Sequence, residues 1–180
     1  MIRRINFFGG PQTGKSTIAT RIFSEMKSKN FSVEYVHEYI KFWTYLGLIP
    51  KSFDTLYVTA KQIHREDVIL NSGVDYIVSD SPILLACAYL KKYNFCCANE
   101  IINITKKFEI KYPSLNILLL RGEYHYEQKG RYETEEQARE MDNIIVDTMS
   151  KEIKNYKIFK CTEVDKIITY VVSSLNNNDG

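Results

Sequence analysis

The chain has 180 residues, 44% of them hydrophobic and 26% charged, which is the composition of an ordinary globular domain. Its formal net charge of +2 excludes the strongly basic surface that draws proteins to nucleic acids or anionic membranes. No apolar run of about 18 residues is present, so no membrane span is expected. We expect one domain over residues 1–175 and a disordered tail over residues 176–180, in a protein of the cytoplasm, or of the host cytoplasm if it is viral.

The first expected elements are a strand at residues 2–8 and a helix at residues 16–29, and the loop between them carries a complete Walker A motif. The pattern G-x-x-x-x-G-K-[ST] runs from Gly9 to Ser16. The N–H groups of such a loop cradle phosphate oxygens, while Lys15 contacts the β- and γ-phosphates and the Ser16 hydroxyl binds Mg²⁺. ATP and Mg²⁺ are therefore expected to bind at Gly9, Gly10, Pro11, Gln12, Thr13, Gly14, Lys15, Ser16 and Thr17.

Strands and helices then alternate to the end of the chain. Strands are expected at residues 32–36, 76–79, 116–120 and 157–161, and helices at residues 54–70, 83–92, 99–111, from 134 and from 162. Thr134 and Gln137 have the spacing of a capping box, which marks the start of a helix. The alternation predicts the three-layer α/β fold of P-loop NTPases, with a five-stranded parallel sheet and helices on both faces.

Charged residues follow three of the expected strands. They are Glu38, Asp80 and Arg121, and the carboxyl ends of parallel strands are where ligands bind in open sheets. Asp80 ends a strand of the Walker B type, which makes it a candidate Mg²⁺ ligand and catalytic carboxylate. Glu38 is a candidate general base toward an attacking hydroxyl. The sequence leaves open which of the two carboxylates is the base.

The polar stretch at residues 122–133 has no apolar periodicity, and residues from about 122 to 137 are predicted to form a lid over the site. It contains Lys129 and Arg131, and Arg121 directly precedes it. Phosphoryl transfer gathers negative charge on the equatorial oxygens, which arginines of a closing lid can stabilise. Arg131 is the residue predicted to do so.

The helix at residues 54–70 is predicted to face the phosphate acceptor. It carries Gln62, whose carboxamide offers a donor and an acceptor to the edge of a base, and Arg65. Trp43 and its aromatic neighbours could form a slot for a planar group, and packing in the core is the equal alternative. The predicted acceptor site therefore consists of Glu38, Trp43, Gln62, Arg65 and Arg121.

Residues Glu38 to Trp43 resemble the E-x-x-x-x-W segment of deoxynucleoside kinases, which are P-loop nucleoside and nucleotide kinases. The resemblance implies that Glu38 is the base for the sugar hydroxyl and that Gln62 reads the nucleobase. Deoxynucleoside kinases carry an arginine after the acid that ends the third strand, where this chain has serine and proline. Arg65 or Arg121 is expected to replace that arginine.

Residues 128–131 are more similar to the lid of nicotinamide riboside kinases. Over most of its length the chain resembles small bacteriophage-encoded P-loop kinases, which share features at residues 6–11, 62–67, 80–82 and 130–138. Some members of that group are thought to act on hydroxymethylated pyrimidines in phage DNA. The resemblance therefore implies a kinase and leaves modified DNA open as the acceptor.

Three functions are compatible with these features. The first is an ATP- and Mg²⁺-dependent kinase that moves the γ-phosphate to a hydroxyl of a nucleoside or nucleotide. The second is a DNA-modification kinase that phosphorylates 5-hydroxymethyluracil in DNA. The third is a regulatory P-loop ATPase, although a guanine-specific switch is not expected because no N-K-x-D segment occurs. A homodimer is allowed by the apolar surface of the helix at residues 83–92.

Overall fold

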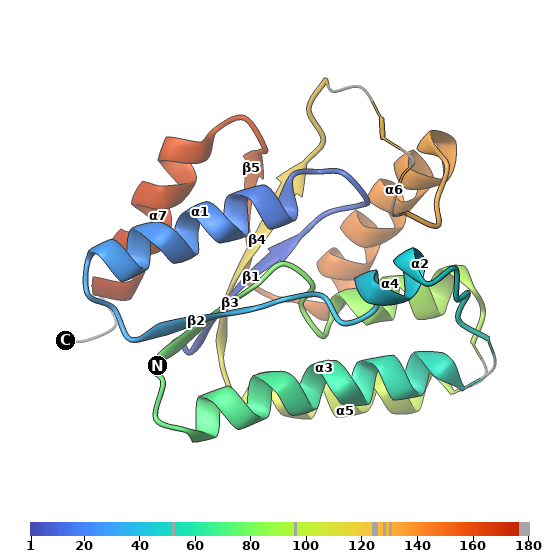
Figure 1. The fold of residues 1–180 in the computed structure, drawn as a ribbon, viewed down its shortest axis with the longest axis horizontal. Helices are drawn as coiled ribbons and strands as arrows, with labels where there is room; N and C mark the ends of the chain where they lie inside the picture. The colour runs from blue at the N-terminus through green and yellow to red at the C-terminus, as the bar shows by residue number, and fades with distance from the viewer. Residues whose placement is uncertain (52, 96, 124–125, 128, 130, 177–180) are drawn as a thin grey trace.

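A sheet of five parallel strands lies at the centre of the protein (Figure 1). The computed structural model describes residues 1–51, 53–95, 97–123, 126–127, 129 and 131–176. The strands are β1 (Arg4–Phe8), β2 (Val33–Val36), β3 (Tyr76–Ser79), β4 (Ser114–Leu120) and β5 (Lys157–Lys160). They lie in the order β2-β3-β1-β4-β5, with Asn6 of β1 paired with Ser79 on one side and Asn116 on the other.

Helices cover both faces of the sheet, as the alternating pattern predicts. One face carries α1 (Lys15–Ser28) and α7 (Val164–Asn176), and the other carries α3 (Asp54–Asn71), α4 (Leu85–Lys92), α5 (Ala98–Lys111) and α6 (Glu135–Glu152) (Figure 1). The short helix α2 (Lys41–Tyr45) lies between β2 and α3 in the chain. The prediction of a three-layer P-loop fold is confirmed.

Apolar clusters on both faces of the sheet hold the layers together, and a third cluster, with Leu70 of α3 and Phe108 of α5, packs on Ile77 of β3. The core under α1 and α7 includes Ile5, Ile18, Ile22, Ile167 and Val171, and the core under α4 and α6 includes Phe8, Ala88, Leu118, Met141 and Ile145. All of these side chains are almost completely buried. Because each buried large apolar side chain contributes roughly 1.5–3 kcal/mol, the helical stripes account for the attachment of the helices to the sheet.

The bounds of some elements differ from the prediction because main-chain pairing decides them. β4 begins at Ser114 because that residue pairs with Arg4 of β1. α4 begins at Leu85, where the N–H donates to the Pro82 carbonyl oxygen at 2.8 Å in a tighter turn that precedes the helix. α7 includes Asn176, and the rest of the predicted tail, residues 177–180, lies outside the described residues.

The strand order brings the predicted site together. β1 lies between β3 and β4, so the loop after β1 is next to Asp80, which follows β3, and Arg121, which follows β4. This is the edge of the sheet at which the sequence predicts a ligand. Within the described parts of the chain, no helix combines the length and the apolar character needed to span a membrane.

Candidate active site

The phosphate loop between β1 and α1 has a conformation that glycine makes possible. Gly9 and Gly14 have positive φ angles of 148° and 80°. The Thr13 hydroxyl donates to the carbonyl oxygen of Gly10 at 3.0 Å, and the Thr13 N–H lies 3.3 Å from the same oxygen. α1 begins directly after the loop, at Lys15. The loop and the helix N-terminus therefore have the arrangement of an anion-binding site.

The ammonium group of Lys15 lies over this loop. Its Nζ donates to the carbonyl oxygens of Gly9 and Gly10, each at 2.8 Å. Burial lowers the pKa of Lys15, while the charges of Glu38 and Asp80 raise it. Phosphate oxygens are stronger partners for an ammonium group than neutral carbonyl oxygens, so a bound triphosphate can take their place.

Two carboxylates, Glu38 and Asp80, lie beside the ammonium group, as predicted from their positions after β2 and β3. The Ser81 hydroxyl donates to Oε1 of Glu38 at 3.4 Å. Burial raises the pKa of Glu38, the charge of Lys15 opposes this rise, and the charge of Asp80 adds to it. Glu38 therefore holds its proton more tightly than an ordinary carboxyl, which brings it nearer to the range in which a general base works.

The residues at the loop fit a magnesium ion that completes its coordination with other ligands. Asp80 is 5% exposed, and its Oδ1 atom is buried without a hydrogen bond in the described part of the chain. A buried carboxylate oxygen without a partner is costly, and a cation would satisfy it. The described residues contain no group of three or more His, Cys, Asp or Glu that could hold a metal. Mg²⁺ suits such a site because it commonly uses one or two protein ligands, here Ser16 and Asp80, with phosphate oxygens and waters.

Tyr35, which was not predicted as a site residue, lies beside these groups. Its hydroxyl oxygen is buried and makes no hydrogen bond of ordinary geometry in the described structure. Burial raises the pKa of Tyr35, as do the charge and the hydrogen-bonding of the Asp80 side chain and the charge of Glu38, while hydrogen-bonding by the Ser16 side chain lowers it. The hydroxyl therefore faces the proposed metal ligands and remains protonated at neutral pH.

Arg121 is fixed beside the phosphate loop by a residue that the sequence analysis did not identify. The carboxylate of Asp142, on α6, accepts from Arg121 Nε at 2.6 Å and Nη2 at 3.0 Å. The same carboxylate accepts from the backbone N–H of Gly10 at 3.2 Å. The guanidinium and the Gly10 N–H thus share one carboxylate oxygen, and the charge of Arg121 lowers the pKa of Lys15. The structure therefore groups Arg121 with the phosphate loop and not with α3.

The other predicted acceptor residues lie around α2 and α3. The Trp43 ring stacks on Tyr57 with centroids 6.1 Å apart. The Arg65 guanidinium lies over the Tyr39 ring, 4.7 Å from its centroid. Gln62 is 6% exposed, and its Oε1 accepts from the backbone N–H of Tyr39 at 3.2 Å. These three residues meet at the segment that carries Glu38.

The lid contacts both sides of the site. The Glu127 N–H donates to Oε1 of Gln12 in the phosphate loop at 2.8 Å, and the Tyr132 hydroxyl donates to the Leu48 carbonyl oxygen at 2.6 Å. Arg131 donates to the Glu127 carbonyl oxygen at 2.6 Å, so one of its contacts lies within the lid itself. Its predicted place on the transferring phosphate stays a prediction. Four residues of the predicted lid lie outside the described residues, at 124–125, 128 and 130.

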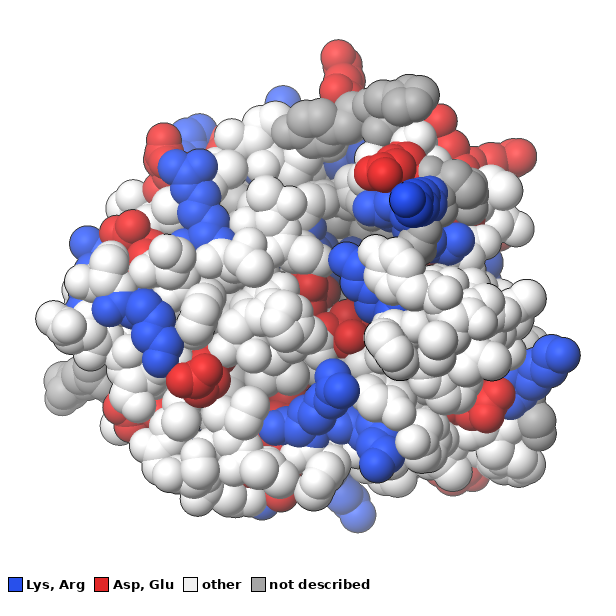
Figure 2. All heavy atoms as spheres, viewed as in Figure 1, with Lys and Arg blue, Asp and Glu red and all other residues white. Residues whose placement is uncertain are grey.

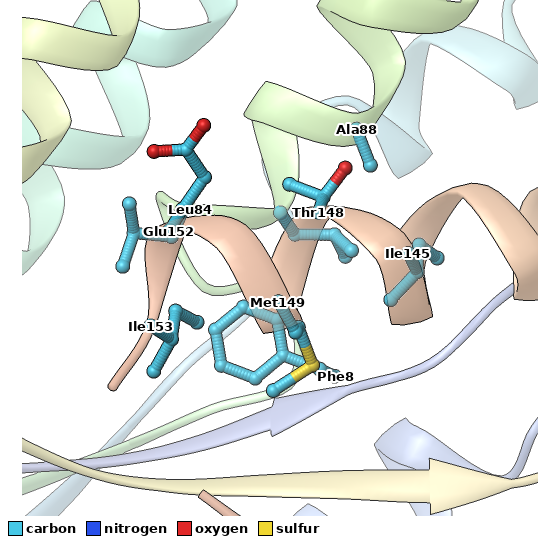
Figure 3. Close-up of a pocket in the computed structure, with 9 residues that line it drawn as sticks. Phe8, Leu84, Ala88, Ile145, Thr148, Met149, Glu152 and Ile153 are labelled. Atoms are coloured by element: carbon cyan, nitrogen blue, oxygen red, sulfur yellow. The ribbon is translucent and has the colours of Figure 1, made fainter. Parts of the chain in front are cut away.

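A small cavity between β1, α4 and α6 does not belong to this site (Figure 3). Its lining residues are Phe8, Leu84, Leu85, Ala88, Ile145, Thr148, Met149, Glu152 and Ile153. Its volume of about 10 Å³ leaves room for one water at most. The cavity is a packing gap of the core, and a nucleotide cannot enter it.

Comparisons with known proteins agree with this fold. A family model described as AAA domain matches residues 4–164. The comparison with curated proteins finds no significant match. Among solved structures, deoxyadenosine kinase from M. mycoides, with the products dCMP and a flexible dCDP bound, matches over 97% of this chain and 99% of that chain, with a TM-score of 0.58 and 18% identity. This likeness confirms the P-loop fold, while the bacteriophage relationship stays a prediction. Because the family match spans residues 4–164, the chain belongs to the AAA domain family of P-loop proteins.

Proposed function

We propose that the protein is a phosphotransferase that moves the γ-phosphate of ATP to a hydroxyl of a nucleoside or nucleotide. The observation that supports this most strongly is the grouping of Lys15, Glu38 and Asp80, because the charges of both carboxylates act on the ammonium group. A phosphate-binding cation beside two carboxylates supplies a place for the donor, a metal ligand and a base. The likeness to deoxyadenosine kinase, whose structure holds nucleotide products, supports the same class of acceptor.

The donor binds at the phosphate loop in this proposal. Loop N–H groups and the Lys15 ammonium orient the phosphates, and Arg121 adds a second positive charge that Asp142 holds in place. Mg²⁺, held by Ser16 and Asp80 when bound, neutralises charge on the phosphate oxygens. Positioning and charge supply most of the catalysis in phosphoryl transfer, and these residues provide both.

The acceptor hydroxyl lies next to Glu38 in this proposal. The carboxylate takes the proton of the acceptor hydroxyl as the hydroxyl oxygen attacks the γ-phosphorus, the bond from that phosphorus to the β,γ-bridging oxygen breaks, and ADP leaves. The Ser81 hydroxyl keeps one oxygen of the Glu38 carboxylate oriented. General bases of this kind typically contribute about 10²–10⁴-fold to the rate. A flat group of the acceptor packs near Trp43 and Tyr57, whose rings already stack on each other. Arg131 of the lid stabilises charge that develops on the equatorial oxygens.

Phosphate transfer from labelled ATP to a panel of acceptors tests the proposal. The panel holds nucleosides, nucleoside monophosphates, nicotinamide riboside, plain DNA and DNA with hydroxymethyluracil. We expect label on a small nucleoside or nucleotide, lost in the Lys15→Ala variant and kept in the Lys29→Ala variant, in which an exposed lysine paired with Glu25 is removed. Equal transfer by the Lys15→Ala variant would show that the site assignment is wrong. ATP binding without transfer to any acceptor would favour the regulatory ATPase.

Modified DNA is a second candidate acceptor, and one surface feature favours it. The segment that follows Glu38 exposes aromatic side chains, with Phe42, Tyr45 and Phe53 each more than half exposed. Lys61 lies over the ring of the half-exposed Tyr57, 5.5 Å from its centroid. Aromatic rings interleaved with lysines are the surface on which unpaired bases stack.

The charge distribution limits how tightly this surface could hold DNA. Acidic and basic side chains are mixed across the face seen in Figure 2, and the net charge is +2. Binding would therefore depend on stacking and would weaken with added salt only slightly. Label found only on DNA with hydroxymethyluracil, and lost in the Phe42→Ala variant, would support this second candidate over the first.

A further inference from the structure

The side-chain amide of Gln62 is already engaged by the protein at both ends. Its Oε1 accepts from the Tyr39 backbone N–H at 3.2 Å, and its Nε2 donates to Oε1 of Glu66 at 3.4 Å. The side chain is 6% exposed. Little of the amide is therefore presented to an acceptor molecule.

These two contacts fix the orientation of the amide. A backbone N–H needs an acceptor and a carboxylate needs a donor, so only one placement of the Gln62 oxygen and nitrogen satisfies both. The reverse placement would set the Gln62 NH₂ against the Tyr39 N–H, and the Gln62 oxygen against the Glu66 carboxylate. Both contacts would then be repulsive in a buried position, where unpaired polar groups are costly.

Glu66 is itself anchored to the central strand. Its Oε2 lies 3.1 Å from Nε of Arg4, and neither side chain is exposed to solvent. The Ser79 hydroxyl of β3 lies 3.4 Å from the other oxygen of Glu66. Arg4 is held in turn by Glu109 at 3.0 Å and by the Tyr112 carbonyl oxygen at 3.2 Å. A buried chain of polar contacts thus runs from β1 to Gln62.

This series of polar contacts ends next to Glu38, the proposed general base. The N–H of Tyr39 belongs to the same planar peptide unit as the carbonyl group of Glu38. Fixing that N–H therefore fixes the peptide plane that follows Glu38 and limits the directions its carboxylate can take. We propose that Gln62 is a positioning residue for Glu38, anchored through Glu66 and Arg4, and that it does not read the nucleobase. This inference rests on the proposed function, because it assigns a partner to the base of that reaction.

The anchoring itself is tested by hydrogen exchange, which needs no enzymatic activity. In nitrogen-15-labelled protein, the Tyr39 amide should exchange slowly, and the Gln62→Met variant should raise its exchange rate at least about tenfold because the acceptor is removed. Methionine has a similar length and no hydrogen-bonding amide, so the helix keeps its packing. The His64→Ala variant, which changes an exposed neighbour on α3, should leave the rate unchanged. Unchanged Tyr39 exchange in the Gln62→Met variant would overturn the inference.

Kinetics with acceptors of different bases test the consequence. We expect the Gln62→Met variant to lower kcat by about 10- to 100-fold for every acceptor, because a misplaced Glu38 carboxylate affects all acceptors alike. The ratios of KM between acceptors with different nucleobases should be preserved. The Glu66→Gln variant, whose altered group lies behind Gln62, should lower kcat in the same way and by a smaller factor. ATP binding by each variant shows that it is folded.

The kinetic outcomes distinguish a Gln62 that positions Glu38 from a Gln62 that reads the nucleobase. A selective rise in KM for one base, with kcat and the Glu66→Gln variant unaffected, would overturn the inference and make Gln62 a base reader. Absence of transfer by the unaltered protein would instead overturn the proposed function, and the exchange measurement would still decide whether Gln62 anchors the Tyr39 peptide.

Discussion

The Asp142 carboxylate accepts hydrogen bonds from the Arg121 guanidinium and from the backbone N–H of Gly10. It thereby joins α6, the end of β4 and the phosphate loop at one point. The approach is close, because a Cβ at position 10 would collide with the Asp142 carboxylate and lie 3.1 Å from the Ala138 carbonyl oxygen, so a side chain there would displace that carboxylate. The helix that follows the lid is therefore bonded directly to the loop that binds phosphate.

Removing the Asp142 carboxylate should destabilise the protein and weaken ATP binding. In the Asp142→Ala variant, an Arg121 side chain that is 13% exposed loses its charged partner. We expect the free energy of unfolding to fall by about 1.5–3 kcal/mol, the range for hydrogen bonds to charged groups. ATP affinity should fall as well, because the Gly10 peptide and Arg121 lose their anchor. Urea unfolding and calorimetric titration with ATP measure the two effects.

Asp147 on the same helix provides the control for this change. It pairs with Lys151 at 2.7 Å, with 53% of its side chain exposed. The Asp147→Ala variant should cost about 0.5 kcal/mol or less and leave ATP affinity unchanged, because exposed pairs contribute little. Equal losses for the two variants would show that Asp142 has no special role at the loop.

The capping box at the start of α6 should stabilise the end of the lid. The Thr134 hydroxyl accepts from the Gln137 N–H at 3.3 Å, and the Gln137 side chain accepts from the Thr134 N–H at 3.0 Å. The Thr134→Ala variant should lower the free energy of unfolding by about 1 kcal/mol, and Thr134→Ser should restore most of it. Thermal and urea unfolding of both variants measure this. No difference between alanine and serine would show that the cap does not contribute.

Local patterns in the sequence predict most of the fold. The phosphate loop is a short contiguous motif, and the box at Thr134 and Gln137 depends on residues three apart, so both are readable without tertiary structure. The parallel sheet follows from the alternation of strands and helices. The positions of Glu38, Asp80 and Arg121 after strands were sufficient to predict that they lie near Lys15, because parallel strands end at one edge.

Contacts between distant residues could not be predicted in this way. Asp142 and Gly10 are 132 residues apart, and nothing in the helical pattern of α6 distinguishes Asp142 from the acidic residues that face solvent. Tyr35 reads as an ordinary strand residue, and its relation to Asp80 arises only when β2 and β3 pair. The anchoring of Gln62 likewise depends on the register between α3 and the segment after β2. These contacts can be seen only in the folded structure, because the hydrophobic pattern of a helix or strand indicates which of its faces is buried and does not indicate which residues its side chains contact.

The pH dependence of the protein should report on Glu38. Burial raises its pKa above the ordinary value of 4.5, so the group binds its proton more tightly in the folded protein than in the unfolded chain. Its contribution to stability is present below the unfolded pKa and is lost as the pH rises through the folded pKa. The Glu38→Gln variant lacks this loss, so its stability relative to the unaltered protein should increase with pH. Urea unfolding at pH values from about 4 to 8 measures the difference.

The same shift predicts the acid limb of the reaction. A general base acts when deprotonated, so transfer should increase as the pH rises through the raised pKa of Glu38. The limb should lie above the pH at which an ordinary carboxyl titrates and should be absent from the residual activity of the Glu38→Gln variant. An unaltered limb in that variant would identify another base, with Asp80 the first candidate.

Removing the Tyr35 hydroxyl should separate stability from activity. The hydroxyl oxygen is buried beside Asp80 and Ser16 and makes no hydrogen bond of ordinary geometry in the described structure, so the Tyr35→Phe variant should change the free energy of unfolding by no more than about 1 kcal/mol in either direction. The matched change is Tyr112→Phe, because the Tyr112 hydroxyl lies 2.8 Å from the Asp67 carboxylate and 2.9 Å from the Asn71 amide oxygen. The free energy of unfolding of that variant, measured in urea, should fall by about 1.5–3 kcal/mol, the range for a hydrogen bond to a charged group.

The effect on activity should be larger for Tyr35→Phe than for Tyr112→Phe, the reverse of their effects on stability. The Tyr35 hydroxyl faces Ser16 and Asp80, so it is placed to hydrogen-bond a carboxylate or a water of the proposed metal site when that site is filled. The Tyr35→Phe variant should therefore need more Mg²⁺ for half-maximal transfer, while Tyr112→Phe should keep the unaltered Mg²⁺ dependence. A Tyr35→Phe variant with lower stability and unchanged Mg²⁺ dependence would show that the hydroxyl is structural, and that Ser16 and Asp80 act without it.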